Sequence, residues 1–209
     1  LLKSVYADSS EDELLQMMNF IKKRKDEQMM GGTGGGDRQK NKNLARQAAK
    51  YLRKSDGPRV AVFEVNGFDT HAAQGGVDGT HTKCLVEMDE IINNLRDNLQ
   101  EAYKDTIILT VTEFGRTIKQ NGGNGTEHGY GTAIFMAGGL LKKSQVHTDW
   151  PGLKRKEMYE GRDLNATIDA RSVYASAMST VFDLDFKRIQ KDVFWGEDLQ
   201  NLSDKLFKV

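Results

Sequence analysis

Apolar side chains recur at helical spacing near the start of the chain and then give way to glycine. In residues 11–30 the spacing predicts a helix whose apolar face comprises Leu14, Leu15, Met18 and Ile21. The stretch GGTGGG that follows has five glycines in six residues, which is typical of a flexible linker or a mobile loop. We therefore expect residues 1–41 to form a helix followed by such a linker, ahead of a domain at residues 42–209.

The pattern within residues 42–209 alternates between predicted helices and predicted strands. Apolar residues at helical spacing favour helices at residues 42–54, 81–103 and 165–183. Short runs rich in valine and other apolar residues favour strands at residues 59–65, 105–112 and 132–139. This order predicts an α/β fold, in which helices cover a sheet.

Two of these elements carry more specific expectations. The run at residues 105–112 is apolar on both faces, which indicates a central strand of the sheet. The helix at residues 165–183 has two candidate N-cap residues, Thr167 and Asp169, whose side-chain oxygens can accept hydrogen bonds from the first turn.

Charge and composition narrow the classes of function. The chain has 30 basic and 30 acidic residues, so its formal net charge is zero at pH 7. This balance argues against binding to nucleic acids or membrane surfaces by charge. No apolar run approaches the roughly 20 residues of a membrane-spanning helix. The single cysteine, Cys84, excludes an internal disulfide and a cysteine-based zinc knuckle.

Two loops that follow predicted strands contain most of the residues that suit a functional site. The first loop, FDTHAAQG, carries Asp69 and His71. The second, EFGRTIKQNGGNGTEHG, begins at Glu113 and ends with Glu127 and His128. In α/β sheets ligands bind beyond the carboxyl ends of the strands, where such loops meet. We therefore expect four of these side chains to converge at one edge of the sheet: Asp69, His71, Glu113 and His128.

Carboxylates and imidazoles brought together in this way suit a divalent ion of zinc, manganese or iron. The same residues also fit a hydrogen-bonded polar network without metal, or plain surface loops. Arg116 in the second loop has two interpretations as well. Its guanidinium suits a bidentate clamp for an anionic substrate, or a salt bridge to Glu113 or Glu127.

Four stretches of the chain resemble, in the same order, motifs of a bacterial protein family. They are NGFDTHAAQ, TVTEFGRTIKQNGGNGTEHGYG, IFMAGGLLK and ATIDARSVYA. On these motifs the chain resembles the family called domain of unknown function 1501, from about residue 44 to the end. The resemblance implies the alkaline phosphatase-like superfamily, with sulfatases and phosphopentomutase, and hence an α/β sheet covered by helices on both faces.

The metal ligands of that superfamily can be carried over residue by residue. Asp69 and His71 look like its first Asp…His pair, and His128 looks like its final histidine. Glu113 stands where those enzymes have an aspartate, and Phe114 replaces the adjacent histidine and cannot bind metal. The resemblance therefore implies one metal ion, or none, instead of two.

The resemblance implies part of a metal-dependent hydrolase that acts on phosphate or sulfate esters, with a small anionic ester as substrate. Arg116 and Glu127 are the candidate catalytic residues, and Arg116 would steady the charge that develops on the anion. The rival expectation is a non-catalytic exported α/β domain that binds a partner or a glycan.

The start of the chain suggests that part of the fold lies elsewhere. The sequence begins Leu-Leu-Lys, without a methionine or a signal peptide. Nothing before Val60 matches the GGNDG-like stretch in the family's N-terminal half, which would supply a further acidic ligand and any nucleophile. We expect an incomplete, C-terminal part of the fold, completed by the missing N-terminal half or by another chain. Family members often carry a twin-arginine signal, which implies a periplasmic or exported location.

Overall fold

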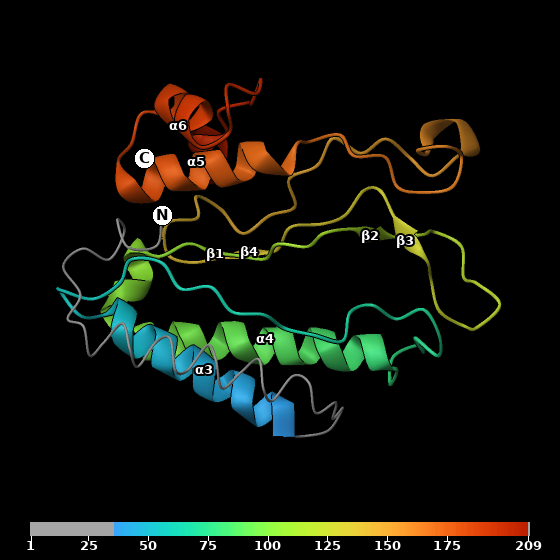
Figure 1. Ribbon diagram of the computed structural model, residues 1–209, viewed down its shortest axis with the longest axis horizontal. Coiled ribbons are helices and arrows are strands. Elements are labelled where there is room, and N and C mark those ends of the chain that lie inside the picture. The colour runs from blue at the N-terminus through green and yellow to red at the C-terminus, as the bar shows by residue number, and fades with distance from the viewer. Residues whose placement is uncertain (1–35, 209) are drawn as a thin grey trace. The chain divides into compact units, whose positions relative to one another are not determined.

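The computed structural model describes residues 36–208, which are coloured in Figure 1. The helix expected at residues 11–30 and nearly all of the glycine-rich linker lie outside this part of the chain. The chain divides into compact units at Leu1–Gln39 and Lys40–Val209. The second unit contains all the elements on which the candidate site depends.

Helices α3 (Gly36–Leu52) and α4 (Thr80–Leu99) confirm the helices expected at residues 42–54 and 81–103. A 3-10 helix, η1 (Gln100–Asp105), continues directly from α4. The two α-helices share a buried cluster formed by Ala45, Ala49, Ile91, Leu95 and Leu99. Its members on α4 are four residues apart, so they fall on one face of that helix.

Helix α5 (Ala170–Phe182) confirms the helix expected at residues 165–183. Its N-cap is Asp169, not Thr167, and the Asp169 carboxylate accepts a hydrogen bond from the backbone N–H of Arg171 at 2.8 Å. Two short helices follow along the chain and contact α5: α6 (Phe186–Asp192) and α7 (Ser203–Leu206).

Two serines of α5 fasten the C-terminal segment to this helix. Ser172 and Ser176 are buried, and their hydroxyl oxygens accept hydrogen bonds from the backbone N–H groups of Gln200 and Leu202, at 3.0 and 2.8 Å. Polar groups buried in this way are satisfied, so these serines stabilise the packing and need no catalytic role.

The strands of the described residues are short and antiparallel. β1 (Ile108–Leu109) pairs with β4 (Met136–Ala137), and β2 (Gly115–Arg116) pairs with β3 (His128–Gly129). Strands therefore form within residues 105–112 and 132–139, as expected, but each is only two residues long. The expectation of a central strand at 105–112 is wrong for the described residues, since β1 pairs with β4 alone and Val111 is 72% exposed.

The strand expected at residues 59–65 is also absent from the described structure. Phe63 and Val65 pack against the α3–α4 cluster, whereas Val60 and Val62 are 55% and 90% exposed. Within residues 36–208 no strand is assigned to this segment, and none of the described strands pairs with it. β-branched residues favour a strand only when a neighbour supplies the ladder and the packing, so sequence preference alone did not suffice here.

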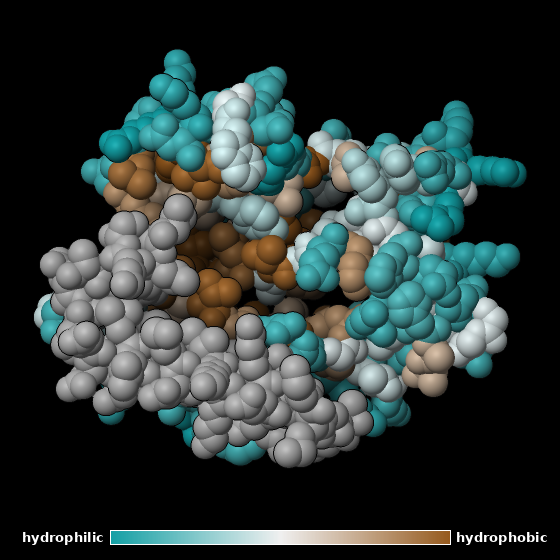
Figure 2. Space-filling model, viewed as in Figure 1, coloured by the Kyte–Doolittle hydropathy of each residue, from teal (hydrophilic) through white to brown (hydrophobic). Residues whose placement is uncertain are grey.

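Exposed apolar residues also lie near the β1–β4 pair. Phe135, just before β4, is 51% exposed, and Figure 2 shows hydrophobic residues at the surface in this region. No helix between residues 36 and 208 combines the length and the apolar character needed to cross a membrane. Helices with two-stranded antiparallel sheets are compatible with many architectures, so the alkaline phosphatase-like fold stays a prediction.

The α3–α4 cluster makes a testable prediction about stability. Leu95 is 5% exposed, so Leu95→Ala should lower the free energy of unfolding by about 2–5 kcal/mol, through lost burial and a cavity. Val62→Ala is the control, because an exposed side chain of this kind should change stability by no more than about 0.5 kcal/mol. Urea unfolding followed by circular dichroism measures both. Equal effects would contradict the core described above.

Candidate metal centre

The two loops singled out in the sequence lie side by side. The backbone N–H groups of Ala73 and Gln74 donate to the carbonyl oxygens of Gly123 and Asn124, each at 2.9 Å. These antiparallel contacts join the first loop to the glycine-rich part of the second. Side chains far apart in the sequence are thereby held next to each other.

Gly125 is the point of closest approach between the loops. A Cβ atom at this position would overlap the backbone of Thr70 and His71. Glycine is therefore required for the loops to meet, a use of its small size that does not involve a ligand. Beyond Gly125, the pairing of β2 with β3 places Arg116 opposite His128.

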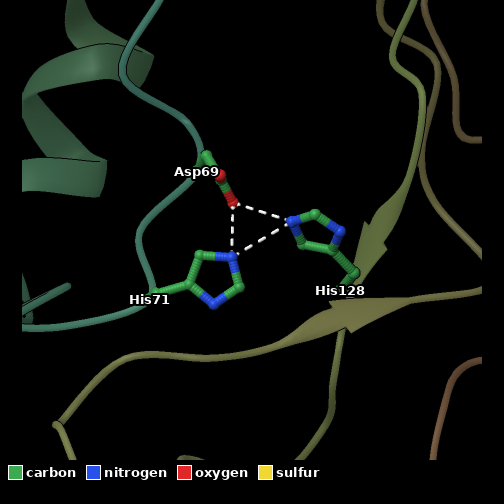
Figure 3. A group of neighbouring side chains, drawn as sticks. All are labelled: Asp69, His71 and His128. Carbon is green, nitrogen blue, oxygen red and sulfur yellow. Dashed lines mark hydrogen bonds and ion pairs between the residues drawn. The ribbon is translucent and has the colours of Figure 1, made fainter.

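Three of the predicted ligands converge where the loops meet (Figure 3). Asp69 Oδ1 lies 3.0 Å from His71 Nε2 and 3.0 Å from His128 Nε2. The two Nε2 atoms lie 3.1 Å apart. All three side chains are exposed, so the group faces solvent. One carboxylate oxygen and two imidazole nitrogens thus form a compact set of atoms that could hold a metal ion.

Glu127 orients the first histidine. Nδ1 of His71 lies 2.8 Å from Glu127 Oε2, and Asn121 Nδ2 donates to Glu127 Oε1 at 2.5 Å. Asn121 also donates to the backbone carbonyl of His71 at 2.8 Å. These hydrogen bonds, first that from Asn121 and then that from His71, lower the pKa of the Glu127 carboxyl. Glu127 is therefore an ionised acceptor that holds the His71 ring.

The hydrogen bond to Glu127 determines which nitrogen of His71 is free. A neutral His71 that donates Nδ1–H to Glu127 carries no proton on Nε2. That nitrogen faces Asp69 Oδ1 at 3.0 Å and His128 Nε2 at 3.1 Å. Its lone pair can therefore accept the Nε2–H of His128 or bind a metal cation. A carboxylate on one side of a histidine and a metal on the other is the common arrangement of metal-binding histidines.

Arg116 holds the aspartate. Its NH1 group donates to Asp69 Oδ1 at 2.7 Å, Nε donates to Thr126 Oγ1 at 2.9 Å, and NH2 donates to the Thr126 carbonyl. The hydrogen bond from Arg116, and then that from His128, lower the pKa of Asp69. The expected contact of Arg116 with Glu113 or Glu127 is therefore wrong in the described residues, where its ion pair is with Asp69.

Glu113 does not join the cluster. It is exposed and is not among the three residues whose ligand atoms lie within 4.8 Å of one another, which corrects the expectation of a four-residue convergence. The neighbouring Phe114 stacks on the His128 ring, with centroids 3.7 Å apart and planes 10° apart. Phe114 therefore supports the imidazole of a candidate ligand, although it cannot bind metal itself.

Asn121, Thr126 and Gln74 are parts of the site that sequence reasoning missed. Thr126 accepts from Arg116 and its hydroxyl donates to Gln74 Oε1 at 2.8 Å. Asn121 stands in a glycine-rich turn, where asparagine is common, and this was the only signal in the sequence. Nothing local indicated that its side chain would reach Glu127.

The His71–Glu127 hydrogen bond predicts a difference between two glutamates of the same loop. Glu127→Gln should weaken zinc binding about 10–100-fold, the usual effect of losing a carboxylate behind a metal-binding histidine. Glu113→Gln, its matched control, should leave the affinity unchanged. Isothermal titration calorimetry on the metal-stripped proteins measures both. Equal affinities of the two variants would refute the role given to Glu127.

Metal affinity should also fall as the pH is lowered from about 7.5 to about 5.5, because protons compete with the metal for the imidazole nitrogens. The lowered pKa values of Asp69 and Glu127 keep both carboxylates charged over this range. Their contribution is lost only at more acidic pH, below their own pKa values. Titrations in non-coordinating buffers check this, and an affinity independent of pH would argue against histidine ligands.

Comparison with known proteins gives one match. The family model described as "Protein of unknown function (DUF1501)" matches residues 6–191, a range that includes both loops of the candidate centre. No curated protein and no solved structure matches the chain significantly. The match concerns the family alone, so placement in the alkaline phosphatase-like superfamily stays a prediction.

Proposed function

The chain belongs to the DUF1501 family, and on that premise we propose that it is part of a metal-dependent hydrolase of phosphate or sulfate esters. One observation carries the proposal. Asp69, His71 and His128 place one oxygen and two nitrogens 3.0–3.1 Å from one another, and Glu127 favours the tautomer of His71 that leaves Nε2 free.

The spacing of the three donor atoms fits a metal ion. At a metal–ligand distance of about 2.1 Å, ligands at right angles lie about 3.0 Å apart and tetrahedral ligands about 3.4 Å apart. The observed separations of 3.0–3.1 Å lie close to both values, so the three donor atoms fit one ion with small side-chain adjustments. Positions on the opposite side then stay open for water and substrate. Two imidazoles with one carboxylate favour zinc, manganese or iron over magnesium or calcium.

The residues around the centre have defined tasks in such a reaction. A bound divalent ion would polarise the ester oxygen and make a coordinated water more acidic. Glu127, expected as a catalytic residue, supports His71 from behind and is a positioning residue in this proposal. Arg116 keeps Asp69 charged and fixed. With all three kinds of guanidinium nitrogen engaged and its side chain 17% exposed, it is poorly placed to take up an anion as well.

Two wider parts of the proposal rest on the sequence motifs. We propose that the complete fold is alkaline phosphatase-like, and that the nucleophile comes from a part of that fold outside residues 36–208 or from another chain. We also propose an exported, periplasmic location. The exposed valines at positions 60, 62 and 111 support the first point, because apolar residues with strand preference usually pack against neighbouring strands.

Metal content and ester hydrolysis test the proposal together. Stripped protein reloaded with zinc, manganese or iron(II) should retain about one ion per chain by elemental analysis. His128→Ala and Asp69→Asn should retain far less, while Glu113→Gln should retain as much as the wild type. Hydrolysis of p-nitrophenyl phosphate or sulfate should depend on the bound ion.

Each outcome of this experiment has a distinct meaning. Protein that binds no metal under any loading condition would refute the centre. Stoichiometric metal without hydrolysis, tested also with the segment that the proposal expects to supply the nucleophile, would refute the enzyme and favour the non-catalytic binding domain.

A further inference from the structure

A turn outside the metal-binding loops is joined to the strand that carries His128. In this turn the backbone N–H of Tyr159 donates to the carbonyl oxygen of Asp163 at 2.9 Å. The N–H of Gly131, three residues after His128, donates to the Leu164 carbonyl at 2.8 Å. The rings of Tyr130 and Tyr159 stack with centroids 4.0 Å apart and planes 15° apart. The Gly131–Leu164 hydrogen bond and the Tyr130–Tyr159 stack hold this turn against the end of β3.

This turn presents an arginine on a buried carboxylate. Asp163 is 1% exposed, and its Oδ2 accepts a hydrogen bond from Arg162 NH2 at 2.8 Å. A buried carboxylate is costly without a cation, so Asp163 holds the guanidinium in place. The Arg162 side chain is 57% exposed, and in the described part of the chain the other N–H groups of its guanidinium have no hydrogen-bond partner. One guanidinium nitrogen of Arg162, NH2, is thus held by Asp163, and the remaining nitrogens are free to donate to a ligand.

Electrostatics relate Arg162 to the candidate metal centre. Its pKa is raised chiefly by the hydrogen bond to Asp163, with smaller contributions from the charges of Glu160 and Glu127. The Gly131–Leu164 hydrogen bond and the Tyr130–Tyr159 stack place the turn of Arg162 beside the strand that carries His128. Arg116, in contrast, is already committed to Asp69 and Thr126. Of these two arginines, Arg162 is the one with N–H groups available for an incoming anion.

We propose that Arg162, positioned by Asp163 and by the Tyr130–Tyr159 stack, binds the anionic phosphate or sulfate group of the substrate beside the metal centre. The proposal deepens the function proposed above and rests on it for the identity of the substrate. A guanidinium suits this task because its planar fork donates two parallel hydrogen bonds to a tetrahedral oxyanion.

Binding of inorganic phosphate, measured by calorimetry on the full chain with and without zinc, tests the proposal. Arg162→Gln should weaken phosphate binding about tenfold or more, and Arg162→Lys should weaken it less, since lysine keeps the charge but loses the fork. Arg188→Gln is the matched control, because Arg188 is 74% exposed on α6 and pairs with Asp192. It should bind phosphate as the wild type does. Zinc content should be the same in all four proteins.

A second variant guards against misfolding, because Arg162→Gln leaves Asp163 buried without its cation. The double variant Arg162→Gln/Asp163→Asn removes both charges and should fold, by circular dichroism, yet show the same loss of phosphate binding. Unchanged phosphate affinity in a folded Arg162 variant, or no phosphate binding by the wild type, would overturn the proposal. Phosphate binding that needs Arg162 in a chain that binds no zinc would uphold the anion site and refute the metal-dependent hydrolase instead.

Discussion

The candidate centre depends on the hydrogen bond between His71 and Glu127. It puts the proton of a neutral imidazole on Nδ1 and turns the lone pair of Nε2 toward Asp69 and His128. Asn121 holds the other oxygen of Glu127, so the glutamate itself has little freedom. If this bond were lost, His71 could protonate Nε2 and donate to Asp69, and the three atoms would form an ordinary polar network. Glu127, which does not belong to the candidate ligand set, therefore determines whether His71 can offer Nε2 to a metal.

Two arginines near the centre carry its positive charge, and each pairs with a different aspartate. Arg116 forms an ion pair with Asp69, and its hydrogen bond lowers the pKa of that carboxyl. The aspartate therefore stays ionised although its loop is exposed. Arg162 stands on a separate turn and is held by a carboxylate that is itself buried. One arginine thus stabilises a candidate metal ligand, whereas the guanidinium of the other is partly exposed to solvent. Sequence position does not separate these roles, since both residues stand in polar, glycine-containing stretches of the chain.

Much of the local structure follows from the sequence. The helices α3, α4 and α5 occur where the apolar periodicity predicts them, because a helix satisfies its backbone within its own segment. Strands depend on partners from elsewhere. Residues 59–65 therefore have the composition of a strand without forming one in the described structure, and residues 105–112 pair over only two positions.

For the site, the sequence predicted that Asp69, His71 and His128 would meet, because their residue types and their positions after successive apolar segments singled out these two loops, and the three side chains do come together. The tertiary structure decided the rest. It left Glu113 outside the cluster and placed Glu127 against Nδ1 of His71. The pairing of the two loops sets these distances, and spacing along the chain does not encode them. Hydrogen bonds and ion pairs act over about 3 Å through space, and only the folded chain determines which groups come that close.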